Sequence, residues 1–180
     1  MRGYLVLENG EVFEGERIGV IKDTACEVVF NTAMVGYIEN FTDPSYEGQG
    51  VVMTYPLIGN YGIIKDDIES TKIWAKAIFV HELAQFESNF RTNGTLESFL
   101  IENDIPGLKG VNTRKLTKVL RDKGTMKGYL TSDISIMSFY FCTTYFFYKI
   151  FHCIIFNFFF YFFHIRNITC KISFHCSFIS

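Results

Sequence analysis

The stretch YLVLENGEVFE at residues 4–14 decides the fold class, because it places two strand-forming runs on either side of a tight-turn dipeptide. Residues 4–7 and 11–14 carry the apolar, β-branched and aromatic side chains that favour strands. Asn9 and Gly10 both tolerate the positive φ that the two central positions of a type I′ turn require. The stretch therefore predicts a β-hairpin closed by a type I′ turn.

Further strand-forming runs follow the hairpin. Residues 27–30, 50–55, 73–80 and 127–130 are each rich in β-branched or aromatic side chains, and each predicts a strand. A short helix is expected at residues 37–41. The Asp-Pro step at residues 43–44 ends it. The first half of the chain is therefore expected to be mostly β-structure.

Two longer helices are expected late in the chain. Residues 95–102 place apolar side chains at helical spacing on one face. A second helix should begin at Asn112 or Thr113, either of which can cap free N–H groups, and should end at Gly124. Strands outnumber helices and the clear helices come late, so we expect an α+β fold, mostly β with two late helices.

The composition changes abruptly after Asp133. All 19 acidic residues, all 14 glycines and all three prolines lie at or before this position. Residues 134–180 consist mainly of Phe, Ile, Tyr, Ser, Thr, Cys, His, Asn and Lys. We therefore divide the chain into a domain at residues 1–133 and a low-complexity Phe/Ile/Tyr-rich tail at residues 134–180.

Three interpretations of this tail remain open. Residues 139–163 are long enough for a transmembrane helix, but Lys149, His152 and Asn157 would then lie at costly depth. A buried core segment would lack the small residues that let aromatic side chains interdigitate. The residue types match A/T-rich codons, as when a reading frame runs on into non-coding sequence. We favour run-on sequence, and the alternative is a membrane-anchored interaction module.

The cysteines and histidines give no sign of a metal site. Cys26 lies in an apolar run and is interpreted as a small core residue. The tail cysteines and histidines lack the paired, short, repeated spacing of structural zinc ligands. His81 is interpreted as a surface or core histidine rather than a catalytic base. No metal ligand is predicted.

The net charge and the N-terminal sequence indicate where the protein is located and which classes of partner it has. A net charge of -2 gives no reason to expect the basic face of a nucleic-acid-binding protein. The chain begins MRGY and continues into a strand, without the basic and apolar regions of a signal peptide. We therefore expect a cytoplasmic protein without a nucleic-acid partner, associated with a membrane only if the tail is a real span.

Residue chemistry alone reveals no active site in residues 1–133. The chain has no glycine-rich phosphate-binding loop, and residues 59–62 (GNYG) are interpreted as a turn. The neighbouring acids Asp66 and Asp67 are interpreted as a solvated loop. From these patterns alone, the chain is an α+β domain of unassigned function.

Several stretches, taken in order, closely resemble one known family. They are residues 27–37 (EVVFNTAMVGY), 42–49 (TDPSYEGQ), 53–62 (MTYPLIGNYG), 110–117 (GVNTRKLT) and 121–128 (RDKGTMKG). Together they resemble the small chain of glutamine-hydrolysing carbamoyl-phosphate synthase. Matching stretches in the same order are far more specific than one short motif.

The resemblance covers roughly residues 3–133 and implies the N-terminal domain of such a small chain. In that family this domain packs against the large synthetase chain, which is the implied partner. A following class I amidotransferase domain hydrolyses glutamine through Cys, His and Glu. The large chain uses the ammonia, bicarbonate, ATP and Mg to make carbamoyl phosphate for the pyrimidine and arginine pathways. No cofactor is therefore expected in this chain.

The resemblance also implies one substrate contact, Ser45 in the loop Asp-Pro-Ser-Tyr. In the family, the serine at this position contacts the substrate L-glutamine. A hydroxyl can satisfy a polar group of glutamine, and the proline would hold the turn. The alternative is that Ser45 closes its own turn through a local backbone bond. No catalytic residue is predicted.

Two departures from the family pattern limit the expected activity. Asn112 stands where the family usually has Asp, although either residue caps a helix. After Asp133 the chain has no glycine and no acid, so it lacks the Gly-flanked cysteine turn and the glutamate of the glutaminase domain. Cys142 is no substitute for that nucleophile. By resemblance the chain is a small-chain fragment cut before the glutaminase domain, uncertain as an enzyme and inactive alone.

Overall fold

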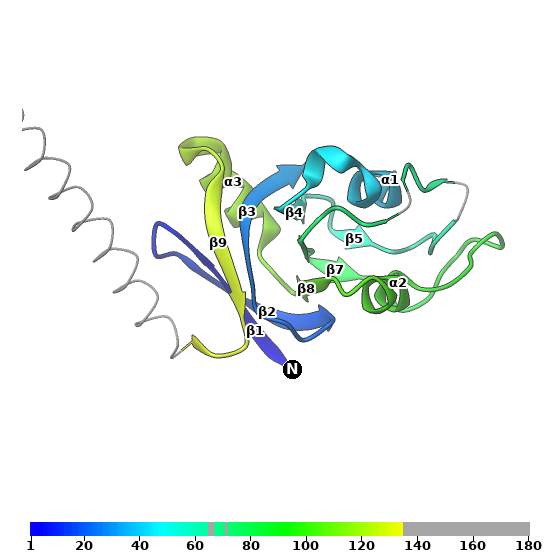
Figure 1. The fold of residues 1–180 in the computed structure, drawn as a ribbon, viewed down its shortest axis with the longest axis horizontal. Coiled ribbons are helices and arrows are strands. Elements are labelled where there is room, and N and C mark those ends of the chain that lie inside the picture. The colour runs from blue at the N-terminus through cyan, green and yellow to red at the C-terminus, as the bar shows by residue number, and fades with distance from the viewer. Residues whose placement is uncertain (65–66, 71, 135–180) are drawn as a thin grey trace, which may run out of the picture. The chain divides into compact units, whose positions relative to one another are not determined.

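The computed structural model describes residues 1–64, 67–70 and 72–134, and these form an α+β domain built on a closed barrel (Figure 1). The predicted fold class is therefore confirmed. Around the barrel, each strand is hydrogen-bonded to the next and the last to the first. The order is β1 (Arg2–Leu7), β2 (Val12–Gly19), β8 (Pro106–Lys109), β6 (Ala77–Phe79), β4 (Gln49–Met53), β3 (Thr24–Asn31) and β9 (Met126–Thr131).

The first two strands form the predicted hairpin, but the predicted turn type is wrong. Gly10 has a φ of 86°, whereas Asn9 has a negative φ and so cannot be the first residue of a type I′ turn. The Asn9 side chain instead accepts a hydrogen bond from the Glu11 N–H at 3.0 Å. This local bond accompanies the negative φ of Asn9, and the positive φ of the turn falls on Gly10.

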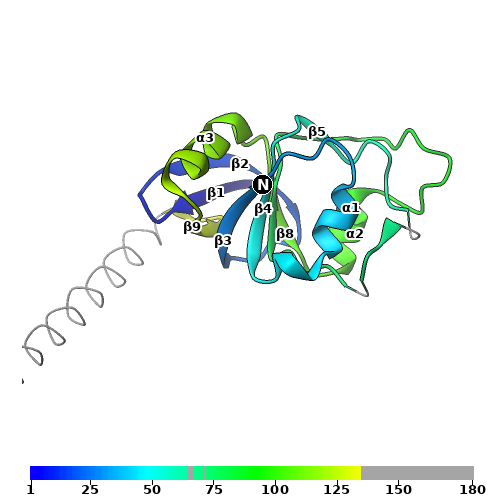
Figure 2. The same cartoon turned by 90° about the horizontal axis from the view of Figure 1, so that it is seen from above.

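Parallel strand pairs, which the sequence did not predict, explain the second layer of the domain. The pairs β3–β4, β4–β6 and β6–β8 are all parallel, so each connection must return to the starting end of the sheet. These connections carry α1 (Tyr37–Thr42), the 3₁₀ helix η1 (Pro44–Tyr46) and α2 (Leu96–Glu102). They also carry the small parallel sheet of β5 (Leu57–Ile58) and β7 (Glu82–Leu83). Both α-helices lie on the same side of the barrel (Figures 1 and 2).

The central strands β4 and β6 are buried on both faces. Val52 and Phe79 belong to the core inside the barrel, whereas Val51 and Ile78 belong to a second core beneath the two helices. All four side chains have no exposed surface. A strand covered on both sides must be apolar at consecutive positions, which explains the unbroken apolar run in β4.

The last helix, α3 (Thr113–Lys123), confirms the sequence prediction at both ends. Asn112 caps its start, with Oδ1 accepting from the Lys115 N–H at 2.9 Å. Gly124 follows its last turn with a φ of 89°. Leu116 and Leu120 enter the barrel core. In Figure 2, α3 lies on the side of the barrel away from α1 and α2.

The predicted strand at residues 73–80 is too long. The barrel strand is β6, Ala77–Phe79, because the preceding backbone turns towards α1, where the Trp74 N–H donates to the Phe41 carbonyl at 3.0 Å. Strand β8 was missed because its Pro-Gly start is typical of a turn. The two-residue β7 is too short to leave a periodic signal.

Two stacked tyrosines fix the start of α1. The rings of Tyr37 and Tyr61 lie 4.2 Å apart between centroids. The Tyr61 hydroxyl accepts hydrogen bonds from the N–H groups of Gly36, at 2.8 Å, and Tyr37, at 3.0 Å. The Tyr37 hydroxyl donates to the Gly62 carbonyl at 2.6 Å. Burial raises the pKa of both phenols, so they stay neutral and can make these bonds.

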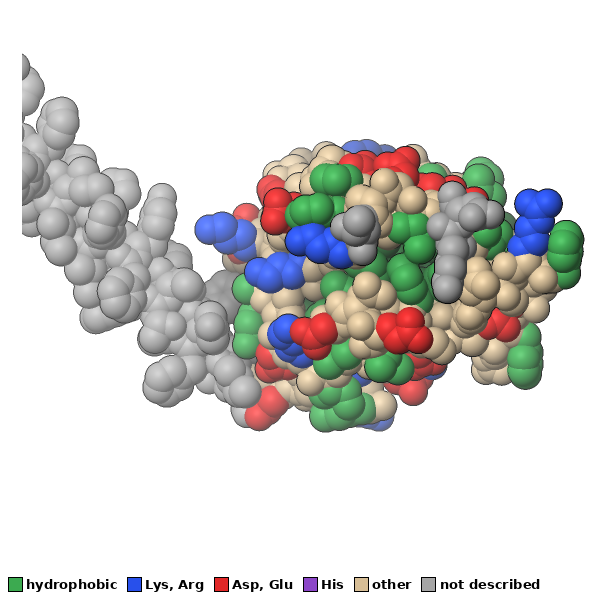
Figure 3. Space-filling view, turned by 45° about the vertical axis from the view of Figure 1, so that its right-hand side comes forward, with side chains coloured by type: hydrophobic (Ala, Val, Ile, Leu, Met, Phe, Trp, Pro, Cys, Tyr) green, Lys and Arg blue, Asp and Glu red, His purple; other side chains and the backbone are tan. Residues whose placement is uncertain are grey.

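On the face shown in Figure 3, acidic and basic side chains are interspersed with hydrophobic ones. Exposed hydrophobic side chains of the domain include Phe86, at 83 % exposure, and Phe90, at 93 %. No helix within the described residues is long and apolar enough to cross a membrane. The interpretations of residues 135–180, including the membrane span, lie outside the described part of the chain.

Replacing Tyr61 with Phe tests whether the Tyr61 hydroxyl stabilises the start of α1. The substitution keeps the stacked ring but leaves two partly buried N–H groups at the start of α1 without their acceptor. The free energy of unfolding should fall by about 1–3 kcal/mol. Denaturant titration measures it, with Tyr4→Phe as control, because Tyr4 is a half-buried barrel tyrosine for which no side-chain hydrogen bond is seen. Equal losses in the two variants would contradict the role.

Candidate functional site

Ser45, the predicted glutamine contact, lies in η1 on an exposed loop directly before β4. Its backbone N–H donates to Asp43 Oδ1 at 2.8 Å. Hydrogen bonds from the backbone and then the side chain of Ser45 hold the pKa of Asp43 below its ordinary value. The Asp43 carboxylate therefore closes this turn by accepting from the Ser45 backbone, and Ser45 itself is exposed to solvent.

Hydrogen bonds of the Asn31 side chain fix the position of the Ser45 loop. The Asn31 Nδ2 atom donates to Asn40 Oδ1 and to the Tyr46 hydroxyl, both at 2.9 Å. Its Oδ1 atom accepts from the Ala33 N–H at 2.7 Å. One amide at the end of β3 thus holds α1 and the residue next to Ser45. Sequence reasoning missed this role, although Asn31 is a polar residue directly after an apolar strand.

Thr42 anchors the other side of the loop. Its buried hydroxyl donates to the Ile38 carbonyl at 2.9 Å and accepts from the Glu69 N–H at 3.1 Å. The Ser70 hydroxyl donates to the Thr42 carbonyl at 2.6 Å. Because both flanks are fixed in this way, the position of Ser45 is set by the fold.

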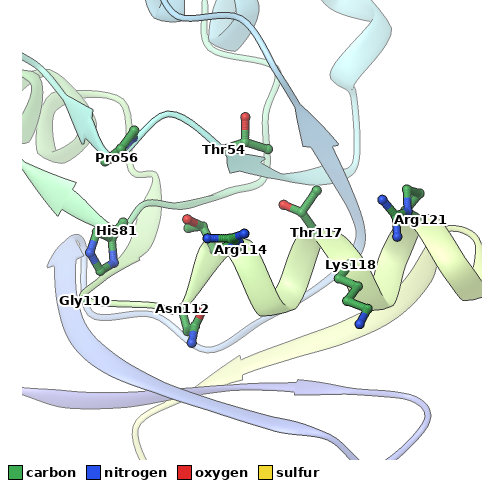
Figure 4. A pocket seen from close by; sticks show the side chains of 10 residues that line it. Thr54, Pro56, His81, Gly110, Asn112, Arg114, Thr117, Lys118 and Arg121 are labelled. Atoms are coloured by element: carbon green, nitrogen blue, oxygen red, sulfur yellow. The ribbon is translucent and has the colours of Figure 1, made fainter.

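A second concave feature is lined by residues that follow β4, and Ser45 is not among them (Figure 4). It is a cavity of about 730 Å³ between α3 and the segments that follow β4 and β6. The residues lining it include Thr54, Pro56, His81, Arg114, Thr117, Lys118 and Arg121. The Ser45 loop precedes β4 in the chain, whereas Thr54 follows the strand.

The chemistry of this cavity is cationic. Arg114, Lys118 and Arg121 all project from α3. His81 is an exposed residue whose Nδ1–H donates to the Val111 carbonyl at 3.0 Å. Lining residues of this kind suit an anionic ligand. The i, i+4, i+7 spacing of the three cations could have been found from the sequence.

Cys26 is a core residue, as predicted. It is 6 % exposed, and burial raises the pKa of its thiol to about 12. The thiolate that a nucleophile requires is therefore scarce at neutral pH. Within the described ranges, no group of three or more His, Cys, Asp or Glu side chains could hold a metal ion.

Comparisons with known proteins identify the family. The family model described as "Carbamoyl-phosphate synthase small chain, CPSase domain" matches residues 5–130. The carbamoyl phosphate synthase small chain of Clostridium perfringens is 53 % identical over 135 residues, which are 75 % of this chain and 39 % of that protein. The pyrimidine-specific small chain of Bacillus subtilis is 52 % identical over 133 residues, 74 % of this chain and 36 % of that protein.

These relatives are much longer than the matched region. The match lies in their N-terminal part, and it spans little more than a third of their length. The match coincides with the barrel domain, because residues 5–130 run from β1 into β9. The chain therefore belongs to the carbamoyl-phosphate synthase small chain family, of which it carries the CPSase domain.

Proposed function

We propose that residues 1–133 serve as the N-terminal domain of a carbamoyl-phosphate synthase small chain. The domain packs against a large synthetase chain and borders the glutamine site through Ser45. The observation that carries the proposal is an exposed serine on a loop fixed at both flanks, within a domain of this family. A preorganised hydroxyl costs little entropy when it binds a substrate.

The local bond to Asp43 is compatible with this role. A serine hydroxyl has one donor and two acceptor lone pairs, so it can donate to Asp43 and accept from a substrate N–H. The Asp43 carboxylate, with its lowered pKa, stays ionised at neutral pH and keeps the hydroxyl oriented. Glutamine would meet a fixed acceptor at this edge of the domain.

The rest of the reaction belongs to other parts of the assembly. Glutamine hydrolysis requires the class I amidotransferase domain. The large chain would use the released ammonia with bicarbonate, ATP and Mg. The proposed location is the cytoplasm, and carbamoyl phosphate would enter pyrimidine or arginine synthesis. The family assignment supports these proposals.

The purified chain should release no ammonia from glutamine, with or without a large chain. The reason is chemical: Cys26 is a buried thiol of raised pKa, and no glycine or acid follows Asp133 to build the missing nucleophile turn and acidic partner. A coupled ammonia assay measures the release. Hydrolysis that is abolished by Cys142→Ala and retained in Cys26→Ala would contradict the prediction.

Ser45 is best tested in a hybrid that joins residues 1–133 to the glutaminase domain of a relative, assembled with its large chain. Ser45→Ala should raise the KM for glutamine, because one neutral hydrogen bond is lost. The cost should be about 0.5–1.5 kcal/mol, or roughly twofold to tenfold in affinity. Synthesis from free ammonia should not change, because ammonia bypasses the glutamine site.

The matched control is Ser98→Ala, which removes a hydroxyl that bonds locally to Thr95 at 2.7 Å in the first turn of α2. It should leave both activities unchanged. Pro44→Ala should affect the KM less than Ser45→Ala, since it loosens the turn and keeps the hydroxyl. An equal fall of glutamine-dependent and ammonia-dependent synthesis in Ser45→Ala would assign Ser45 to folding or to the subunit contact.

A further inference from the structure

The cavity beside α3 carries a line of positive charge. Arg114, Lys118 and Arg121 lie at positions i, i+4 and i+7, which fall within about 60° of one another around a helix. Their Cα atoms span roughly 10 Å along the axis, at about 1.5 Å per residue. The three side chains therefore start from points that are spread along two turns of the helix.

Two other lysines of the same helix are neutralised, and this contrast distinguishes them from the cations that line the cavity. Lys115 and Lys123 both pair with Glu11, at 3.3 and 3.7 Å. In the part of the chain that the structure describes, Arg114 and Lys118 form no ion pair. Arg121 pairs with its exposed neighbour Asp122 at 3.1 Å. Arg114 and Lys118, which have no ion-pair partner among the described residues, suit an anion from outside.

The wall between these cations also has hydrogen-bonding capacity. The Thr117 hydroxyl is buried in the cavity wall without a hydrogen-bond partner. It points from α3 towards the side of Thr54, which follows β4 (Figure 4). A buried polar atom without a partner is costly, so an occupant that supplies one is stabilised.

We propose that this cavity binds an extended acidic segment of a partner protein. Alternate side chains of an extended segment lie about 7 Å apart, close to the roughly 6 Å that separate Arg114 and Lys118 along the helix. A rotation of the Thr117 side chain would bring its hydroxyl, which is buried in this structure, within reach of a backbone group of such a segment. The tail of this chain is not the occupant, because residues 134–180 contain no acid.

The inference is independent of the proposed glutamine contact, because Ser45 does not line the cavity. Loss of one function leaves the other in place. The Ser45 variants therefore serve as internal controls for the experiment on the cavity.

The test measures fluorescence anisotropy of a labelled Glu-Thr-Glu-Thr-Glu peptide, capped at both ends, titrated with the full 180-residue chain at low ionic strength. The peptide should bind, and its Gln-Thr-Gln-Thr-Gln counterpart should not. The double substitution Arg114→Gln with Lys118→Gln should weaken binding roughly tenfold, because two charge contacts are lost. Thr117→Val, which is isosteric, should weaken it about threefold without lowering thermal stability.

The matched control is Lys115→Gln with Lys123→Gln, which removes the same charge from residues of α3 that do not line the cavity. Its affinity should change less than about twofold, since Glu11 already neutralises these lysines. The proposal is overturned by equal weakening in the control or by absence of peptide binding. It is also overturned if inorganic phosphate or a single-stranded oligonucleotide displaces the peptide more effectively than unlabelled peptide does. Self-association of the chain that is lost in Arg114→Gln with Lys118→Gln would assign the cavity to a second copy instead.

Discussion

The burial of β4 and β6 on both faces is the constraint on which the rest of the structure depends. Because Val51 and Val52 both need apolar surroundings, the domain must supply one core inside the barrel and another outside it. Parallel pairing of these strands forces the chain to cross over the outer side repeatedly. The outer core, α1, α2 and the connecting loops all follow from that requirement.

Both candidate sites arise at the ends of β4 for this reason. The connection that enters the strand carries α1 and the Ser45 loop, and Asn31 fixes it from the end of the neighbouring strand β3. The connection that leaves the strand carries Thr54 and faces α3 across the cationic cavity. A rigid strand that is covered on both sides thus gives each site a fixed support, while the loops supply the chemistry.

The sequence predicted those parts of the fold that depend on local signals. The bounds of α3 followed from Asn112 and Gly124, and the end of α1 followed from the Asp-Pro step. The parallel pairings could not be predicted, because they depend on which strands share the two cores. The turn at Asn9 was mistaken because a side-chain bond to the Glu11 N–H competed with the left-handed conformation. The role of Ser45 was predicted from the family resemblance. The helical spacing of the α3 cations can be read from the sequence, but the sequence does not show that they line a cavity.

The central claim is that the fold presents Ser45 to glutamine at a fixed position. A crystal structure of the hybrid small chain, assembled with a large chain and bound to glutamine, tests it most directly. The account predicts Ser45 Oγ within about 2.7–3.2 Å of a polar glutamine atom, with the Asn31–Tyr46 hydrogen bond unchanged from 2.9 Å. Glutamine bound out of reach of Ser45, with the hydroxyl engaged by Asp43 alone, would contradict it.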